Sequence, residues 1–478
     1  MQRCGACTFD NPPDTFLCGM CNAELRLCQE TSTELSDGFV LFARRLWDGR
    51  SDFCVSDTTH GMCVAVECGR IAWLGRADRL PYGTRHIIDL REQDSTIIPG
   101  LIDAHVHMEF DPKYSLHGQP QLGAEAAMDR LKARALSMVS HGITSARDLG
   151  GKGGAMLLRD AIDRGECVGP RLLCAGQPLT KPQGHCHQWG GEVRGEAQIR
   201  SVIERQVRSG ADLIKIMATG GVRTPGTNPA ESAFSQEELN AAAAAARMHG
   251  KRLAAHAHGV GGIATAAAAG VHTIEHCSWV DRHGAWGRYD ESTIGEIAQR
   301  GIFVCPTVGA GWARQPALQS ALSPALERMH LTGVRIVAGS DCGAIPNLAH
   351  HRLADGVVVL GRCAGMSHAE ALRSATSEAA AALGLEAECG TLSEGHSADL
   401  LVVRGDPIGG SLERSLCAPP LAVVCRGVQH RVCPGAPPAG GGARTPLWAR
   451  FGAMNFGGEE STDYGLGSSA QCACNTML

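Results

Sequence analysis

Side chains that bind divalent metal ions recur along this chain, each at the end of a short apolar run. The runs read IIPGLIDAHVH, ADLIKIMATGG, RLAAHAHG, HTIEHC and RIVAGSDCG. Imidazole and carboxylate groups are zinc ligands, and a metal ion held by such groups can activate water for hydrolysis. We therefore expect a metal-dependent hydrolase. The candidate metal ligands are His105, His107, Lys215, His256, His276 and Asp341.

The apolar runs predict β-strands, and helix signals lie between them from residue 98 to 385. This alternation predicts a parallel α/β barrel, in which side chains at the carboxyl ends of the strands meet on one face. The predicted strands end near His107, Asp148, Gln177, Ala218, His258, His276, Val308 and Asp341. Capping boxes predict three helix starts, at Ser235-x-x-Glu238, Thr293-x-x-Glu296 and Ser367-x-x-Glu370.

His105 and His107 lie two residues apart on a predicted strand, so their side chains share one face and can reach one ion. Taken alone, the pair is equally compatible with two half-buried strand histidines. The turn Pro99-Gly100-Leu101-Ile102-Asp103 before them and the other candidates after them favour metal binding.

Lys215 lies between apolar residues, where a buried ammonium group is costly and would repel a metal ion. Carboxylation by carbon dioxide would convert it to a carbamate, whose two oxygens can bridge two ions. The alternative is a side chain that extends from the strand end to a surface carboxylate. We favour carboxylation, because the site otherwise lacks a bridging acid.

The order His-x-His, Lys, His, His, Asp, opened by Pro-Gly-Leu-Ile-Asp-x-His, resembles the amidohydrolase superfamily. The segments ARDLGG (146–151), KIMATGGVRTPGT (215–227), AAHAHG (254–259) and TIEHC (273–277) resemble its prolidase and imidazolonepropionase-like branch. The resemblance covers about residues 35 to 430 and implies a (β/α)8 TIM barrel. It also implies two divalent ions bridged by a carboxylated lysine. Zinc is the expected ion, although such ligands also accept Mn, Co or Fe.

Five segments follow from these patterns. Residues 1–30 form a Cys-rich module, and residues 98–385 form the predicted barrel. Strand-like runs fill 31–97 and 386–432, and the resemblance implies that these flanks pair into one small β-sandwich. Residues 433–478 are rich in Gly, Pro and Ser, which predicts a disordered tail.

Asp341 is the candidate catalytic residue. Its carboxylate can bind the more buried ion and take a proton from the bridging water, whereas a lone Asp at a strand end could also cap a helix. By alignment with the family, the first histidine of His256-Ala257-His258 is the ligand, so we expect His258 to contact substrate or to support the site.

Other substrate contacts are predicted in loops. His187 lies in the His-rich loop after the third predicted strand, and Arg223 could pair with a substrate carboxylate. Ordinary loop packing is an equal alternative for both. Cys277 and Cys342 directly follow candidate ligands, so strand alternation should turn them into the core.

Two ions would hold a bridging hydroxide near neutral pH and polarise the scissile carbonyl. The chain has no Gly-x-Ser-x-Gly nucleophile elbow. We therefore expect cleavage of an amide (C–N, not ester) bond in dipeptide-like or N-acyl amino acid substrates. One alternative is a cyclic-amide hydrolase of the imidazolonepropionase type. Another is an inactive barrel that serves as a scaffold for a ubiquitin-binding finger.

The N-terminal module has the spacing of a four-cysteine zinc site. About 20 residues cannot build an apolar core, so a structural zinc would have to supply the folding energy. A chance pattern or disulfide pairing is the alternative. The four cysteines are Cys4, Cys7, Cys18 and Cys21.

The pattern Cys7-Thr8-x2-Asn11-x6-Cys18 resembles the RanBP2/NZF zinc-finger family, although Gln2 stands at the position of the usual tryptophan. Thr8, Phe9 and Met20 match the positions that contact ubiquitin in this family. Fingers that bind single-stranded RNA use stacking aromatics and arginines instead, so we expect ubiquitin as the partner. A purely structural finger remains an alternative.

Composition restricts the remaining classes. The charge of 44 basic against 49 acidic residues gives −5, which does not favour a nucleic-acid partner. No stretch approaches the ~18 apolar residues of a membrane span, and the Cys-rich start is not a signal peptide. The chain has 21 cysteines, and those outside the finger are expected to be reduced. We expect a cytoplasmic protein, compatible with a homo-oligomer, whose partner is a small amide or peptide-like substrate.

Overall fold

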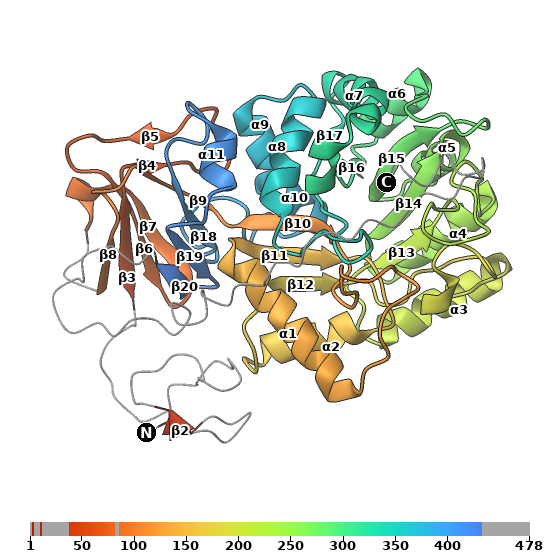
Figure 1. Cartoon of the computed structure of the whole chain (residues 1–478), viewed down its shortest axis with the longest axis horizontal. Coiled ribbons are helices and arrows are strands. Elements are labelled where there is room, and N and C mark those ends of the chain that lie inside the picture. Colours follow the sequence, from red (N-terminus) through yellow and green to blue (C-terminus); the bar gives the residue numbers. More distant parts are fainter. Residues whose placement is uncertain (1, 4–9, 12–37, 82–85, 433–478) are drawn as a thin grey trace, which may run out of the picture.

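A computed structural model describes residues 2–3, 10–11, 38–81 and 86–432, and the structural statements below refer to these residues. The predicted finger cysteines, the predicted ubiquitin contacts Thr8, Phe9 and Met20, and the tail 433–478 lie outside them. The described part has an α/β fold. Figure 1 shows mostly antiparallel strands at one end and parallel strands with their helices at the other.

Two sheets of the first part pack over a separate hydrophobic core. One has the order β7-β6-β3-β8 and the other the order β20-β19-β18-β9-β4-β5. Strand β18 pairs antiparallel with β9, so segments from both sides of the parallel strands share one sheet. The strands are β3 (Phe39–Ala43), β4 (Arg45–Leu46), β5 (Val55–Ser56), β6 (Met62–Glu67), β7 (Arg70–Arg76), β8 (His86–Asp89), β9 (Ser95–Pro99), β18 (Leu400–Arg404), β19 (Ala422–Cys425) and β20 (Val428–Val432). A further pair, β1 (Gln2–Arg3) and β2 (Asp10–Asn11), is antiparallel.

The second part contains two parallel sheets, of three and five strands in sequence order. Their strands are almost entirely buried, as expected for parallel strands covered by helices. The three-stranded sheet contains β10 (Leu101–Val106), β11 (Ile143–Asp148) and β12 (Arg171–Cys174). The five-stranded sheet contains β13 (Ile214–Met217), β14 (Leu253–Gly259), β15 (Thr273–Val280), β16 (Phe303–Cys305) and β17 (Arg335–Ile336).

Backbone hydrogen bonds join the two parallel sheets at both edges. On one side, the Leu179 N–H donates to the Lys215 carbonyl at 2.8 Å, and the Met217 N–H donates to the Leu179 carbonyl at 2.9 Å. On the other, the Asp341 N–H donates to the His105 carbonyl at 2.8 Å. The segment that contains Asp341 therefore lies beside the strand that contains His105.

Most of the described helices lie between consecutive parallel strands, three follow the last of these strands, and one lies between β18 and β19. The helices are α1 (Ala124–Ser140), α2 (Gly154–Asp163), α3 (Gly195–Arg208), α4 (Gln236–Met248), α5 (Val260–Ala269), α6 (Glu291–Gln299), α7 (Pro316–Leu331), α8 (Leu353–Cys363), α9 (His368–Ser374), α10 (Ser377–Leu383) and α11 (Leu412–Leu416). None of these described helices is long and apolar enough to cross a membrane.

Two of the three predicted capping boxes are confirmed. Ser235 opens α4 and Ser367 opens α9, each with the reciprocal glutamate bond. The third prediction is wrong, because Asp290 caps α6 by accepting from the Thr293 N–H. An aspartate three residues upstream is an equally good cap, so the helix begins one turn earlier than predicted.

Strand β9 runs almost directly into β10, and Gly100 separates them. A Cβ at this position would lie 2.2 Å from the Thr144 hydroxyl oxygen, so only glycine allows the chain to pass β11 this closely. The sheet that contains β9 and β18 is thus joined, through one residue, to the strand that contains His105 and ends directly before His107.

Candidate metal centre

His105, His107 and Asp341 form the first group of metal-binding side chains. Both histidines project from the end of β10, as alternation along a strand requires. Their Nε2 atoms lie 3.4 Å and 3.3 Å from Oδ1 of Asp341. That oxygen is buried and accepts no well-formed hydrogen bond. A cation would satisfy it where the three side chains converge.

His107 shows which ring nitrogen is available. Its Nδ1 lies 2.8 Å from the Gly150 carbonyl, and a carbonyl only accepts, so Nδ1 donates and Nε2 keeps its lone pair. Burial lowers the pKa of His107, but Asp341 outweighs burial and raises it overall. A positive charge between His107 and Asp341 is therefore favourable.

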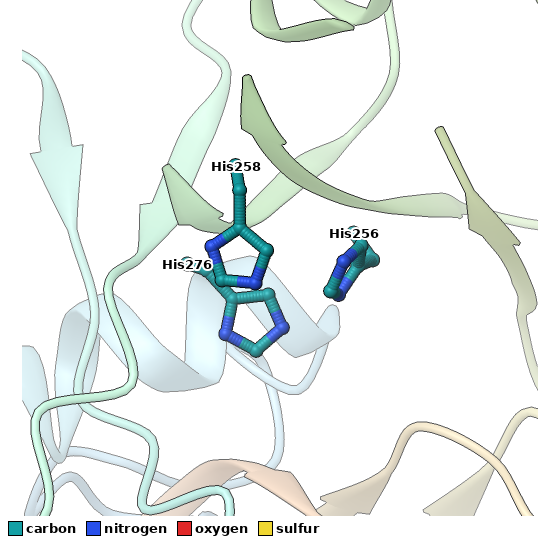
Figure 2. Close-up of side chains that lie close together, drawn as sticks. All are labelled: His256, His258 and His276. Atoms are coloured by element: carbon teal, nitrogen blue, oxygen red, sulfur yellow. The ribbon is translucent and has the colours of Figure 1, made fainter. Parts of the chain in front are cut away.

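His256, His258 and His276 form the second group (Figure 2). His256 lies with its ring centroid 4.6 Å from each of the other two. His256 Nε2 lies 3.1 Å from the Gly220 carbonyl, which leaves Nδ1 as a ligand atom. His258, which we expected to contact substrate, lies as close to His276 as His256 does.

The rings of the second group are neutral, because burial is the largest influence on each. It lowers the pKa of His258 to about 4 and those of His256 and His276 well below the usual value. Neutral imidazole is the form that binds metal ions. The three buried rings therefore offer lone pairs at neutral pH.

Lys215 lies on β13 and lines the same cavity as the two groups. It is 1% exposed, and no described carboxylate forms an ion pair with its amine. Burial lowers the pKa of Lys215 to about 8; Glu275 and Arg147 act on it in opposite directions. A substantial fraction of the Lys215 amine is therefore neutral near pH 8. The neutral amine is the form that can react with carbon dioxide.

The six residues that the sequence singled out as ligands line one cavity of about 60 Å³. The two groups adjoin, since the His105 and His276 rings are 5.1 Å apart. Burial raises the pKa of Asp341, but His105, His107 and Lys215 lower it overall, so it is an anion. Neutral imidazoles and one carboxylate, whose buried Oδ1 has no hydrogen-bond partner, fit divalent metal ions such as zinc.

The loops place a different histidine at this cavity from the one we predicted. His185 lines it, with its ring 4.5 Å from that of His256, and Thr224 lies 2.9 Å from its Nδ1. His187 lies in a short 3-10 helix and is not among the lining residues. Arg223 does line the cavity.

Glu275 and Arg147 were not singled out in the sequence, although both are fully buried beside the site. Glu275 Oε2 lies 2.9 Å from His105 Nδ1, and Arg147 forms an ion pair with Oε1 at 2.9 Å. Burial raises the pKa of Glu275, yet Arg147 and His105 lower it well below its usual range. A charged residue inside an apolar strand was the available signal, because such a group needs a partner when buried.

Several non-glycine residues around the cavity have a left-handed backbone. They include His276 (φ 65°), Thr307 (φ 53°) and Asp341 (φ 56°). Such conformations cost about 1–3 kcal/mol each and cluster at functional sites. Cys277 and Cys342 are buried beside His276 and Asp341, and Cys277 contacts Met329 of α7.

The fold and the cavity define an α/β protein with a histidine-lined pocket at the carboxyl ends of parallel strands. The sequence model of the amidohydrolase family matches residues 96–430, and the chain belongs to this family. It is a hydrolase that acts on carbon–nitrogen bonds.

Individual relatives agree with this placement. The chain is 29% identical over 415 residues to ochratoxinase from Aspergillus niger, covering 79% of this chain and 84% of that protein. It is 25% identical over 389 residues to imidazolonepropionase from Ralstonia nicotianae, covering 72% and 86%. A solved Xaa-Pro dipeptidase with methionine bound in its active site superposes with a TM-score of 0.72 at 27% identity, covering 82% and 99%.

Proposed function

We propose that this chain is a binuclear metal-dependent amidohydrolase that cleaves an amide bond of dipeptide-like or N-acyl amino acid substrates. The observation that carries the proposal is that two groups of metal-binding side chains and Lys215 line one cavity. Hydrogen bonds at both edges of the two parallel sheets support a closed eight-stranded barrel around it.

His105, His107 and Asp341 would hold one ion, and His256 and His276 the other, with carboxylated Lys215 between them. When bound, the two ions supply Lewis acidity and a nucleophilic water at neutral pH. Asp341 accepts the proton of that water and passes it to the leaving amine. The neutral rings and the orphaned Asp341 oxygen support these roles.

The residues that line the cavity are evidence for a substrate with an apolar part and a carboxylate. Arg223 is the candidate partner of the carboxylate, and bidentate pairing would orient the substrate. Tryptophans and aliphatic side chains form the rest of the wall, among them Leu116, Trp189, Met217, Trp312 and Ile345. The names of the relatives, an Xaa-Pro dipeptidase and an ochratoxinase, agree with small amide substrates.

A second candidate is hydrolysis of a cyclic amide, which the match to imidazolonepropionase favours. The two reactions share the metal ligands and differ in the leaving group. An acyclic amide releases a separate amine, whereas a cyclic amide opens without fragmentation. Product analysis by mass spectrometry distinguishes them.

For the N-terminal segment we propose a structural zinc held by Cys4, Cys7, Cys18 and Cys21. The spacing of the cysteines supports it. The matches at Thr8, Phe9 and Met20 support ubiquitin as a binding partner.

Metal content tests these proposals together. Elemental analysis of the full chain should give about three ions, and the double variant Cys18→Ser/Cys21→Ser about two. The loaded protein should hydrolyse N-acyl amino acids faster than the same compounds with the carboxylate blocked as an amide. A full chain that holds only the finger ion, even after reloading with metal and bicarbonate, would contradict the hydrolase.

A further inference from the structure

A buried carboxylate and guanidinium lie behind the candidate metal centre and extend its hydrogen-bond network. Glu275 is 0% exposed, and its two oxygens face different partners. Oε2 lies 2.9 Å from His105 Nδ1. Oε1 accepts from an Arg147 N–H at 2.9 Å and from the Thr273 hydroxyl.

Arg147 is held as firmly as its partner. Its Nε–H donates to the Ala104 carbonyl at 2.7 Å, and another N–H donates to the Thr273 hydroxyl at 3.1 Å. It therefore ties β11, where it lies, to β10 and to β15. An arginine anchored at three points fixes the position of the Glu275 carboxylate.

We propose that Glu275, held by Arg147, is a positioning residue that fixes the tautomer and orientation of His105 for metal binding. A carboxylate only accepts, so His105 Nδ1 donates to it and Nε2 keeps its lone pair. That Nε2 is the atom 3.4 Å from Asp341 Oδ1. This inference rests on the proposed metal site.

A competing assignment makes Glu275 a metal ligand itself, because one of its oxygens, a ring nitrogen of His105 and Cys305 Sγ also lie within 4.8 Å of one another. Arg147 argues against it, since a guanidinium 2.9 Å from the carboxylate would repel a divalent ion. The hydroxyl of Thr273 and the ring of His105 occupy further lone pairs of the same carboxylate. Glu275 is therefore the hydrogen-bond acceptor of His105 and not a metal ligand.

The test separates the His105 hydrogen bond from the buried charge. Removing one member of a buried ion pair is strongly destabilising, so both members are replaced in the full-length protein. Arg147→Met/Glu275→Gln keeps an oxygen that can accept from His105, whereas Arg147→Met/Glu275→Leu removes it. Arg171→Met/Asp399→Asn is the matched control, because Arg171 and Asp399 form a mostly buried ion pair at 2.9 Å and neither lines the cavity.

Each protein is loaded with Co²⁺ and bicarbonate. The visible spectrum of bound cobalt and its transfer to a coloured chelator are then measured. The Leu variant should lose one of its two barrel ions about 10- to 100-fold faster than the wild type, with a changed cobalt spectrum. The Gln variant and the Arg171→Met/Asp399→Asn control should stay close to the wild type, and the second ion should be unaffected. If the Leu variant does not fold, Glu275→Asp tests the same point. It keeps the charge but withdraws the carboxylate from His105, and it should also accelerate release.

Three results would overturn the inference. Wild-type release and spectrum in both the Leu variant and Glu275→Asp would remove Glu275 from this role. Stoichiometric loss of one ion in the Gln variant would make Glu275 a ligand. If the wild type itself binds no ion in the barrel, the proposed function fails first, and the inference fails with it.

Discussion

Nδ1 of His276 lies 2.9 Å from the hydroxyl oxygen of Thr307, and both residues have a left-handed backbone, with φ of 65° and 53°. The contact crosses from β15 to the segment after β16. It fixes one ring nitrogen of His276 and so determines which nitrogen faces His256 and His258. Because these two strained residues hold each other, the orientation of the His276 ring is fixed before an ion binds.

Replacing this hydroxyl tests its effect on metal retention. Thr307→Val keeps the shape of the side chain and removes the partner of His276. We expect affinity for one barrel ion to fall about 10- to 100-fold, as is typical when the partner of a ligating histidine is lost. Competition with a chelator measures it. Thr332→Val, which removes a helix-end hydroxyl far from the cavity, should have no effect; equal loss in both variants would indicate general destabilisation.

Asp341→Asn should separate turnover from metal binding. The amide oxygen can still approach an ion, but it cannot take up the proton of the attacking water. We expect kcat to fall about 10²- to 10⁴-fold, the range for loss of a general base. Most of the metal should stay bound, as measured by elemental analysis. Activity near that of the wild type would remove Asp341 from the proposed role.

The buried position of Lys215 predicts how reactivation depends on pH. Only the neutral amine reacts with carbon dioxide, and burial lowers the pKa of Lys215 from 10.5 to about 8. The neutral fraction therefore rises about tenfold per pH unit below 8 and levels off above it. We expect this profile for the rate at which metal-free protein regains activity with zinc at a fixed concentration of dissolved carbon dioxide.

Two outcomes would count against a carboxylated Lys215. Reactivation independent of carbon dioxide would exclude the carbamate. A rate still rising at pH 10 would place the amine in a water-exposed setting. Lys215→Met serves as the control and should not recover.

His256 and His258 should differ in what their loss removes. His256→Ala should bind one barrel ion fewer, because His256 offers Nδ1 as a ligand atom. His258→Ala should keep both ions and raise KM, as expected of a substrate contact. Metal content and steady-state kinetics on the two variants measure this difference. Loss of an ion in His258→Ala instead would exchange the two assignments.

Strand alternation predicted correctly that His105 and His107 share one face, since the Nε2 atoms of both rings lie within 3.4 Å of Asp341 Oδ1. It fails on β15. Glu275 and His276 are neighbours, yet both contact His105, since the positive φ of His276 breaks the alternation. The role of Glu275 could not be predicted from periodicity, because a local backbone reversal leaves no mark in the pattern of apolar residues.

The loops were predicted less well than the strands, for a related reason. No pattern in the sequence favours His185 over His187, since the two residues lie two apart in one irregular loop. What selects His185 is the hydroxyl of Thr224, which lies on a different loop at 2.9 Å from its ring. Contacts between loops depend on how the strands bring them together, so they follow from the fold and not from local sequence.

The junction at Gly100 also bears on how the chain can fold during synthesis. Strand β9, which leads into β10, pairs with β18 over Ser95–Pro99 and Leu400–Arg404, whereas β4 covers only Thr96 and Ile97. The ribosome must therefore deliver some 300 further residues before β9 gains its main partner. Until then, the strand that contains His105 and ends directly before His107 extends from a nearly unpaired edge, where nascent chains are prone to aggregate. We therefore expect the candidate metal centre to form late in the folding of the chain.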